Sequence, residues 1–277
     1  MKRLSQERSY FVVKDNELIT KSRYSLTLQQ QKILLYFISR IKPDDDEYTT
    51  YELSIKDFSK VCGYVEDSGF YYQTIKTDIK KLADNSNWIE TDNGHEVLFR
   101  WIDRAEIDKN SGTITITFHY TVSRYLFDLR ERYTQYSLYN VLCLSHKYSI
   151  RLYELLNSMK YKERFEISID ELRKRLDAES YTRFNNFNQR ILKPCIDEIN
   201  DYTDLAVEYS YKKSGKTITH IIFEFAEKSV RSAVITRKLQ ADKINPETRK
   251  QERKIKKDLA IETKGEITSQ LSIDDLE

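Results

Sequence analysis

Two stretches of this chain repeat one pattern, one stretch in each half. Residues 52–58 read ELSIKDF, and residues 166–172 read EISIDEL. Each copy follows an amphipathic helical pattern, precedes a basic helical stretch and is followed by β-rich runs separated by turns. The spacing is far too long for a solenoid repeat, so it indicates two related domains. Each has the element order of a winged helix-turn-helix.

The predicted fold class is therefore α+β, with two tandem winged helix-turn-helix domains related by internal pseudo-symmetry. We place the N-terminal domain at residues 1–136 and the C-terminal domain at residues 137–226. After Ala226 the pattern changes to interleaved basic and acidic residues with few large apolar ones. Residues 227–277 are expected to form a charged tail that is partly helical, partly disordered and poorly packed.

Local signals predict several elements of the N-terminal domain. A short strand is expected at residues 10–13, and a helix after Thr27, because Gln30 completes a capping-box pattern. The stretch DNGH between two β-rich runs predicts a hairpin turn at residues 92–95. Residues 121–142 are expected to be helical and to join the two halves.

In the C-terminal domain, Ser145 and Ser168 are expected to cap helices. A basic helix is expected over residues 181–200, with a kink at Pro194, because proline removes a backbone donor and clashes with the preceding turn. A wing follows, with its turn at KKSG, residues 212–215.

Composition excludes several classes of function. The net charge is only +2 although charged residues make up 32% of the chain, so a uniformly basic coat is not expected, while local basic patches are. The three cysteines form no CxxC pair and are read as buried thiols of a reducing cytoplasm. No signal peptide or membrane span is found, so we expect a cytoplasmic protein without membrane contact.

None of the catalytic motifs considered fits the sequence. The letters SGKT at residues 214–217 resemble the end of a phosphate-binding loop, but Ser210 stands where that motif needs glycine, and the segment lies between two strands. The four histidines, His95, His119, His146 and His220, share no metal-ligand spacing. We therefore expect a protein that is not an enzyme and that needs no metal or other cofactor.

Two predicted helices, residues 69–83 and 181–200, carry the strongest indication of a function. Each has an apolar side and an opposite side of amides and cations. Base edges need Asn, Gln, Arg or Lys, and phosphates need cations, so this is the composition of a recognition helix. An ordinary charged surface helix is the alternative, but both helices take the same place in the repeated unit. The predicted DNA-binding residues are Gln73, Lys76, Lys80, Lys81, Arg183, Asn186, Gln189, Arg190, Lys193 and the wing residues Lys212, Lys213 and Lys216.

Several motifs resemble those of the iteron-binding plasmid replication initiators of the two-winged-helix (RepB/RepE-like) family. They are LTLQQQKIL at 26–34, YSIRLYELL at 148–156, FNNF at 184–187, LKP at 192–194 and EIN at 198–200. The resemblance covers about residues 10–226 and is most specific in the second domain. Pro194 is tolerated within this family.

The resemblance implies binding to direct repeats of double-stranded DNA in a plasmid origin, opening of the duplex, and recruitment of host helicase and initiator proteins. It implies that the second domain makes the main contacts to each repeat, and that the N-terminal domain touches DNA and can form a homodimer. Two recognition helices in successive major grooves would cover roughly 20 bp.

Two rival classes remain open from the sequence alone. A two-domain winged-helix transcriptional repressor needs the same DNA-binding parts without initiator activity. A nickase or nuclease would need metal-dependent cleavage, which the histidine spacing does not support.

Overall fold

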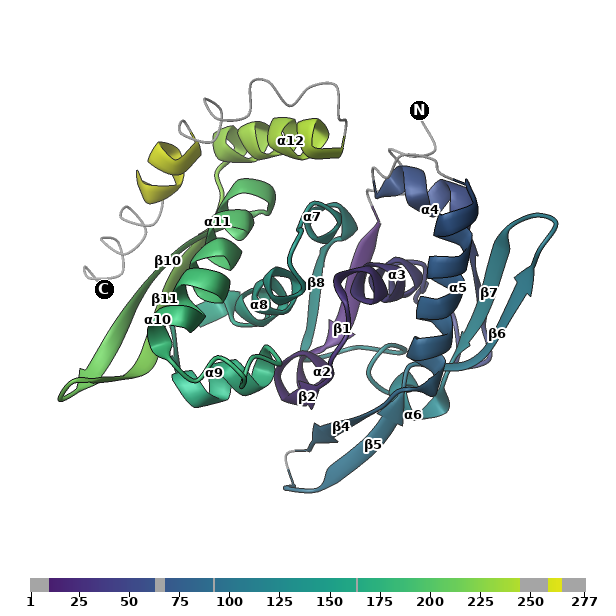
Figure 1. Cartoon of the computed structure of the whole chain (residues 1–277), viewed down its shortest axis with the longest axis horizontal. Helices are drawn as coiled ribbons and strands as arrows, with labels where there is room; N and C mark the ends of the chain where they lie inside the picture. The colour runs from purple at the N-terminus through teal and green to yellow at the C-terminus, as the bar shows by residue number, and fades with distance from the viewer. Residues whose placement is uncertain (1–9, 63–67, 92, 163, 245–258, 266–277) are drawn as a thin grey trace. The chain divides into compact units, whose positions relative to one another are not determined.

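The computed structural model describes residues 10–62, 68–91, 93–162, 164–244 and 259–265. The chain divides into two compact units, unit 1 over residues 1–142 and unit 2 over residues 143–277 (Figure 1). Each unit mixes helices with short antiparallel strands, which confirms the predicted α+β class.

The repeated heptapeptide forms a strand-to-helix corner in each unit. In unit 1 it joins β3 (Thr50–Ser54) to α4 (Ile55–Val61), and in unit 2 it joins β9 (Arg164–Ser168) to α9 (Ile169–Arg175). The strand's last residue is a serine whose hydroxyl accepts from the amide three residues on, at 3.2 Å in both corners. This satisfies one of the amides that a helix leaves free at its start, so the predicted Ser168 cap is confirmed.

The apolar residues of the repeat are buried in both copies: Leu53, Ile55 and Phe58 in unit 1, and Ile167, Ile169 and Leu172 in unit 2. Each corner needs a capping serine and three buried apolar side chains at the same positions, which accounts for the repeated sequence. The corner strand pairs in the same way in both units, antiparallel with the second strand of a hairpin: β3 with β7 (Thr113–Phe118), and β9 with β11 (Thr217–Glu227). The internal symmetry itself stays a prediction.

Unit 1 places its helices over three small antiparallel sheets of order β1-β8, β2-β4-β5 and β3-β7-β6 (Figure 1). The elements not yet given are β1 (Phe11–Asp15), α2 (Asn16–Lys21), β2 (Ser22–Arg23), α3 (Leu28–Ile38), α5 (Ser68–Asp84), β4 (Ser86–Glu90), β5 (Glu96–Arg100), β6 (Ile102–Asp108), α6 (Tyr120–Ser123), β8 (Tyr133–Ser137) and α7 (Leu138–Leu142). The predicted first strand, the capping box at Thr27 and the hairpin before β5 are confirmed; the turn residue Asp92 lies outside the described residues.

The predicted helix over residues 121–142 is wrong. Only short helices form at its ends, and β8 runs between them, antiparallel to β1. In β8 the side chains of Thr134 and Tyr136 are buried, whereas those of Tyr133 and Gln135 are exposed. This alternation, together with pairing to β1, outweighs the helical spacing of the apolar residues.

Unit 2 begins with α8 (Lys147–Ser158), followed by the one-turn η1 (Lys160–Lys162) and the β9–α9 corner. A long helix follows, made of α10 (Phe184–Phe187), the π-helical turn η2 (Asn188–Leu192) and α11 (Lys193–Tyr202). The wing is the hairpin of β10 (Leu205–Ser214) and β11, turning at Gly215 with a φ of 60°.

The helix α8 does not use the predicted Ser145 cap. His146 precedes the helix without a side-chain cap bond. The carboxylate of Glu198, on α11, instead accepts from the amides of Ser145 and His146 and from the hydroxyl of Ser149 at 2.7 Å. A partner distant in sequence thus satisfies the amides at the start of α8, where the helix dipole also favours negative charge.

Part of the predicted tail is folded. Residues Val230–Ile244 form α12, and the side chains of Leu239, Gln240 and Thr236 are buried. The expectation of poor packing is therefore wrong for α12, whose apolar residues are too sparse to reveal the buried face. Residues 245–258 and 266–277 of the tail lie outside the described residues.

Truncation tests this packing. Ending the chain after Glu227 is expected to lower the free energy of unfolding of unit 2 by about 3 kcal/mol or more, because burying Leu239 and Ile244 stabilises by ~1.5–3 kcal/mol each. Urea denaturation followed by circular dichroism measures the change. The control ends after Gly265 and should match the full chain; equal stability of both truncations would contradict the packed role of α12.

Candidate nucleic-acid interface

The long helix over residues 184–202 has one buried side and one exposed side. Phe187, Ile191 and Ile199 are buried, as predicted. The predicted contact residues Asn186, Gln189, Arg190 and Lys193 are exposed. Phe184 differs from prediction, because it is half-exposed and packs edge-on against the Tyr211 ring of the wing, 5.6 Å between centroids.

Pro194 does not end this helix. The π-helical turn η2 comes immediately before it, and Leu192 and Lys193 keep helical dihedrals, with φ near −60° and ψ near −50°. A π turn bonds each amide one residue further back than an α turn, and here the amide of Lys193 donates to the carbonyl of Asn188. A kink at Pro194 stays a prediction; the structure shows a π turn before the proline inside a continuous helix.

A groove of about 860 Å³ lies between the start of this helix and the wing. Its walls come from the start of α9, from α10 and the turn before it, and from the tip of the wing with the first residues of β11. The lining residues are Ser168, Ile169, Asp170, Arg173, Thr182, Arg183, Phe184, Asn185, Asn186, Lys216, Thr217, Ile218, Thr219 and His220.

The groove brings together three predicted residues, Arg183, Asn186 and Lys216. Gln189, Arg190, Lys193, Lys212 and Lys213 are exposed but do not line it. Sequence reasoning missed Asn185, Arg173 and the Thr219–His220 edge of the wing. Adjacency to Asn186 could have signalled Asn185, but the other three are joined only by the fold.

Arg173 connects the wall of the groove to the recognition helix. Its guanidinium donates to the carbonyl of Thr182 at 2.9 Å, lies 3.2 Å from the Asp170 carboxylate and lies over the Phe187 ring at 5.4 Å. Its side chain is 12% exposed. It therefore fixes the turn that leads into the helix rather than lying free on the surface.

The wing lysines differ in their surroundings. Lys212 Nζ lies 2.5 Å from the Glu166 carboxylate, and this hydrogen bond holds the pKa of Glu166 below its ordinary value. Lys213 lies over the Tyr211 ring at 5.6 Å, while Lys216 lines the groove. Lys212 is thus partly neutralised within the fold.

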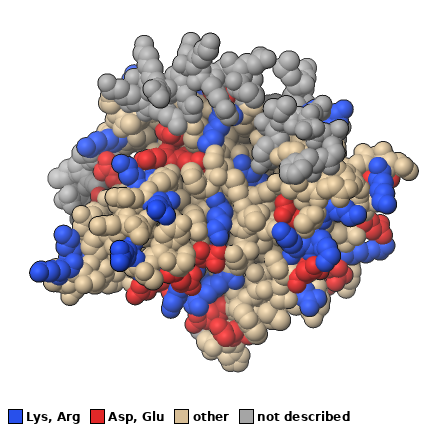
Figure 2. Space-filling model, in the orientation of Figure 1, with Lys and Arg blue, Asp and Glu red and all other residues tan. Residues whose placement is uncertain are grey.

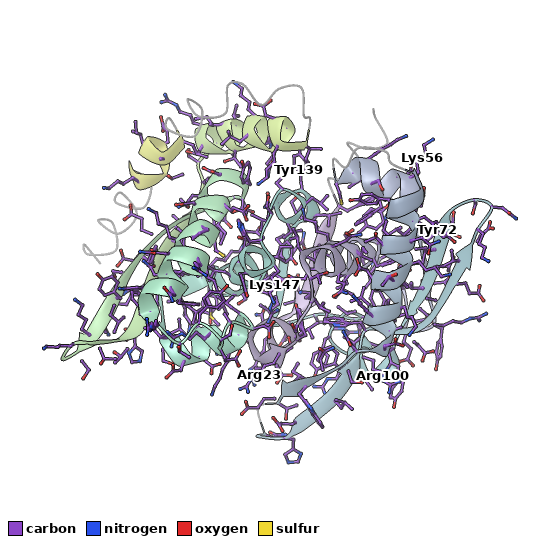
Figure 3. All side chains as sticks on the ribbon, viewed as in Figure 1. Arg23, Lys56, Tyr72, Arg100, Tyr139 and Lys147 are labelled. Atoms are coloured by element: carbon purple, nitrogen blue, oxygen red, sulfur yellow. The ribbon has the colours of Figure 1, made fainter. Side chains whose placement is uncertain are left out.

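In unit 1 the predicted residues Gln73, Lys76, Lys80 and Lys81 are exposed on α5. Figure 3 labels Tyr72 on this helix and Lys56 on the neighbouring α4. Lys80 Nζ lies 2.5 Å from Asp84 on the same helix. The opposite side is held by burial of its apolar residues Ile75, Ile79 and Leu82.

A single glutamine connects α5 to the start of α3. Gln30 Oε1 accepts from the Thr27 amide at 3.0 Å, closing the capping box, and Gln30 Nε2 donates to the buried Asp78 at 2.9 Å. The same side chain thus caps one helix and positions the helix that carries the predicted contacts.

Figure 2 shows lysine and arginine side chains distributed among acidic ones over the face of the molecule that is turned to the viewer. This agrees with the small net charge and with local rather than uniform basicity. The three cysteines are buried, as predicted. Over the described ranges, no group of three or more His, Cys, Asp or Glu side chains could hold a metal ion. Among helices of the described residues, none is long and apolar enough to cross a membrane.

Two family models match consecutive parts of the chain. A model described as "Initiator Replication protein, WH1" matches residues 11–157, and one described as "Initiator Rep protein, WH2" matches residues 168–225. The chain belongs to the initiator replication protein family. The matches confirm two tandem winged-helix domains and the resemblance seen in the motifs.

Relatives within this family are distant. A "Replication initiation protein" of Escherichia coli is 27% identical over 225 residues, covering 77% of this chain and 68% of the relative. The "PI protein" of Escherichia coli is 29% identical over 147 residues, 46% of this chain and 47% of the relative. The crystal structure of "Pi initiator protein in complex with iteron DNA" shares the fold with a TM-score of 0.66 at 21% identity, covering 80% of this chain and 99% of that one.

Glu198 gives a test of how the recognition helix is held. Burial by itself raises its pKa, but Lys243 and hydrogen bonds from Ser149 and His146 outweigh burial and bring the pKa below its ordinary value. A carboxylate with a lowered pKa stabilises the folded state above its unfolded pKa of about 4.3, and this contribution is lost as the pH falls through the folded value.

Glu198→Gln is expected to lower the free energy of unfolding at pH 7 by about 1–3 kcal/mol, since it removes a charged, hydrogen-bonded partner. The difference from wild type should shrink as the pH falls below about 4. Urea denaturation at a series of pH values measures it. Glu208→Gln, on the exposed side of β10, is the matched control; a pH-independent loss in Glu198→Gln would contradict the electrostatic role.

Proposed function

We propose that this initiator binds direct repeats (iterons) in a plasmid origin as double-stranded DNA, promotes opening of the duplex and recruits host helicase and initiator proteins. The observation that carries this is the groove of unit 2, where the exposed side of a recognition helix and the tip of a wing converge. Family membership favours this function over the repressor alternative.

The second unit is proposed to make the main contacts with each repeat. Arg183, Asn186, Gln189 and Arg190 are proposed to reach base edges, because amides and guanidinium groups match the donors and acceptors of the major groove. Lys193, Lys213 and Lys216 are proposed to contact phosphates, and Lys212 to contribute less because Glu166 holds it.

The first unit is proposed to touch DNA through Gln73, Lys76, Lys80 and Lys81 on α5 and to provide the surface of a homodimer. Its basic side chains can contact phosphates, although Lys80 is also paired with Asp84. Binding needs neither metal nor nucleotide in this proposal.

Footprinting on DNA that flanks the gene tests the function. Protected sites should be tandem copies of one sequence, and protection should persist in EDTA. Protection of a single promoter site without tandem copies would favour the repressor, and loss of all binding on chelation would contradict the proposal.

Two neighbouring positions separate base reading from phosphate contact. Arg190→Ala is expected to cost about 1–3 kcal/mol of binding and to relax preference at one or two positions. Lys193→Ala should weaken binding evenly across sequences and lower the salt slope by about one unit. Binding of each variant to the repeat and to random DNA across a salt series measures both effects.

The control for this pair is Lys238→Ala, on the exposed side of α12, which should change neither quantity. If Arg190→Ala and Lys193→Ala both retain wild-type affinity and specificity, the helix is an ordinary surface helix and the assignment is wrong.

A further inference from the structure

The C-terminal end of the recognition helix is capped by residues that follow the wing. A helix leaves its last four carbonyls without partners inside the helix. The carbonyl of Tyr202, the last residue of α11, accepts from Gln240 Nε2 at 2.6 Å. The carbonyls of Asn200 and Thr203 accept from Lys228 Nζ at 2.5 and 2.7 Å. All three carbonyls are therefore satisfied from outside the helix.

These capping contacts are part of one packed element. Lys228 Nζ also donates to the Thr236 hydroxyl at 3.0 Å, which connects it to α12. From α12, Lys243 Nζ lies 3.8 Å from the centroid of the Tyr202 ring and 3.4 Å from a Glu198 carboxylate oxygen. Two lysines thus lie at the negative end of the helix dipole, where cations are favoured. The fully buried Leu239 anchors α12 between these contacts.

The contacts come from chain beyond the matched domain, which ends at residue 225. We propose that α12 positions the recognition helix for DNA reading, with Gln240 and Lys243 as positioning residues that touch no DNA. This inference rests on the proposed function. Helical dihedrals continue from Phe187 through Lys193, so the clamped end and the exposed contact side belong to one continuous helix. Contact residues read DNA only when the elements that carry them are held close to the productive geometry.

The test uses isosteric changes in the full chain. Gln240→Met removes the donor to Tyr202 while keeping the side-chain length, and Lys243→Met removes the charge. Both are expected to weaken binding to the repeat about tenfold while leaving affinity for random DNA and the salt slope unchanged, since neither residue contacts phosphate. Lys243→Arg should restore wild-type discrimination, because a guanidinium keeps both the charge and the contact with the aromatic ring.

The matched control is Lys238→Met, which removes the same charge from the exposed side of the same helix. Binding is measured for both DNAs across a salt series, at a temperature where circular dichroism shows every variant folded. If Gln240→Met and Lys243→Met both discriminate the repeat from random DNA as well as the wild type does, the inference is overturned while the proposed function stands. An equal loss of affinity for random DNA, or a lower salt slope, would also overturn it, because either result would indicate that the substituted residue contacts DNA directly. If the wild-type protein itself does not prefer the repeat, the proposed function fails, and the inference fails with it.

Discussion

The long helix over residues 184–202 exposes one side, while contacts within unit 2 hold its other side and both of its ends. Phe187, Ile191 and Ile199 anchor the length of the helix. At one end Arg173 holds the turn before it, and at the other end the carbonyls accept from Lys228 and Gln240. A helix whose contact residues are long and flexible gains specificity from this rigidity, since only the side chains then need to be ordered on binding.

Glu198 connects these supports to the rest of the unit. It lies on the buried side of the recognition helix, accepts from the backbone at the start of α8 and is paired with Lys243 of α12. One carboxylate thus replaces a local cap, fixes the crossing of two helices and holds a third. A buried carboxylate is stable only with this many donors, because an unpaired one would carry a large desolvation cost.

The sequence predicted what is encoded locally. The Ser168 cap, the capping box at Thr27 and the exposure of the predicted contact residues follow from spacing within a few residues. The predictions that were wrong concern features that depend on distant partners. Strand β8 forms because β1 pairs with it, and the start of α8 is capped by a residue on α11. The groove residues Arg173 and His220 come from separate elements that only the fold brings together.

The distribution of charge sets how such a surface can distinguish DNA sequences. With a net charge of only +2, the long-range attraction to DNA is modest, so specificity must come from placed side chains rather than from a basic coat. Lys212 and Lys80 are each paired with a carboxylate, at 2.5 Å in both cases. A phosphate can engage them only by displacing that carboxylate, and exposed ion pairs of this kind are weak enough for the exchange. Where these lysines contact DNA as proposed, each phosphate contact therefore carries the cost of breaking an ion pair, which weakens the sequence-independent part of binding.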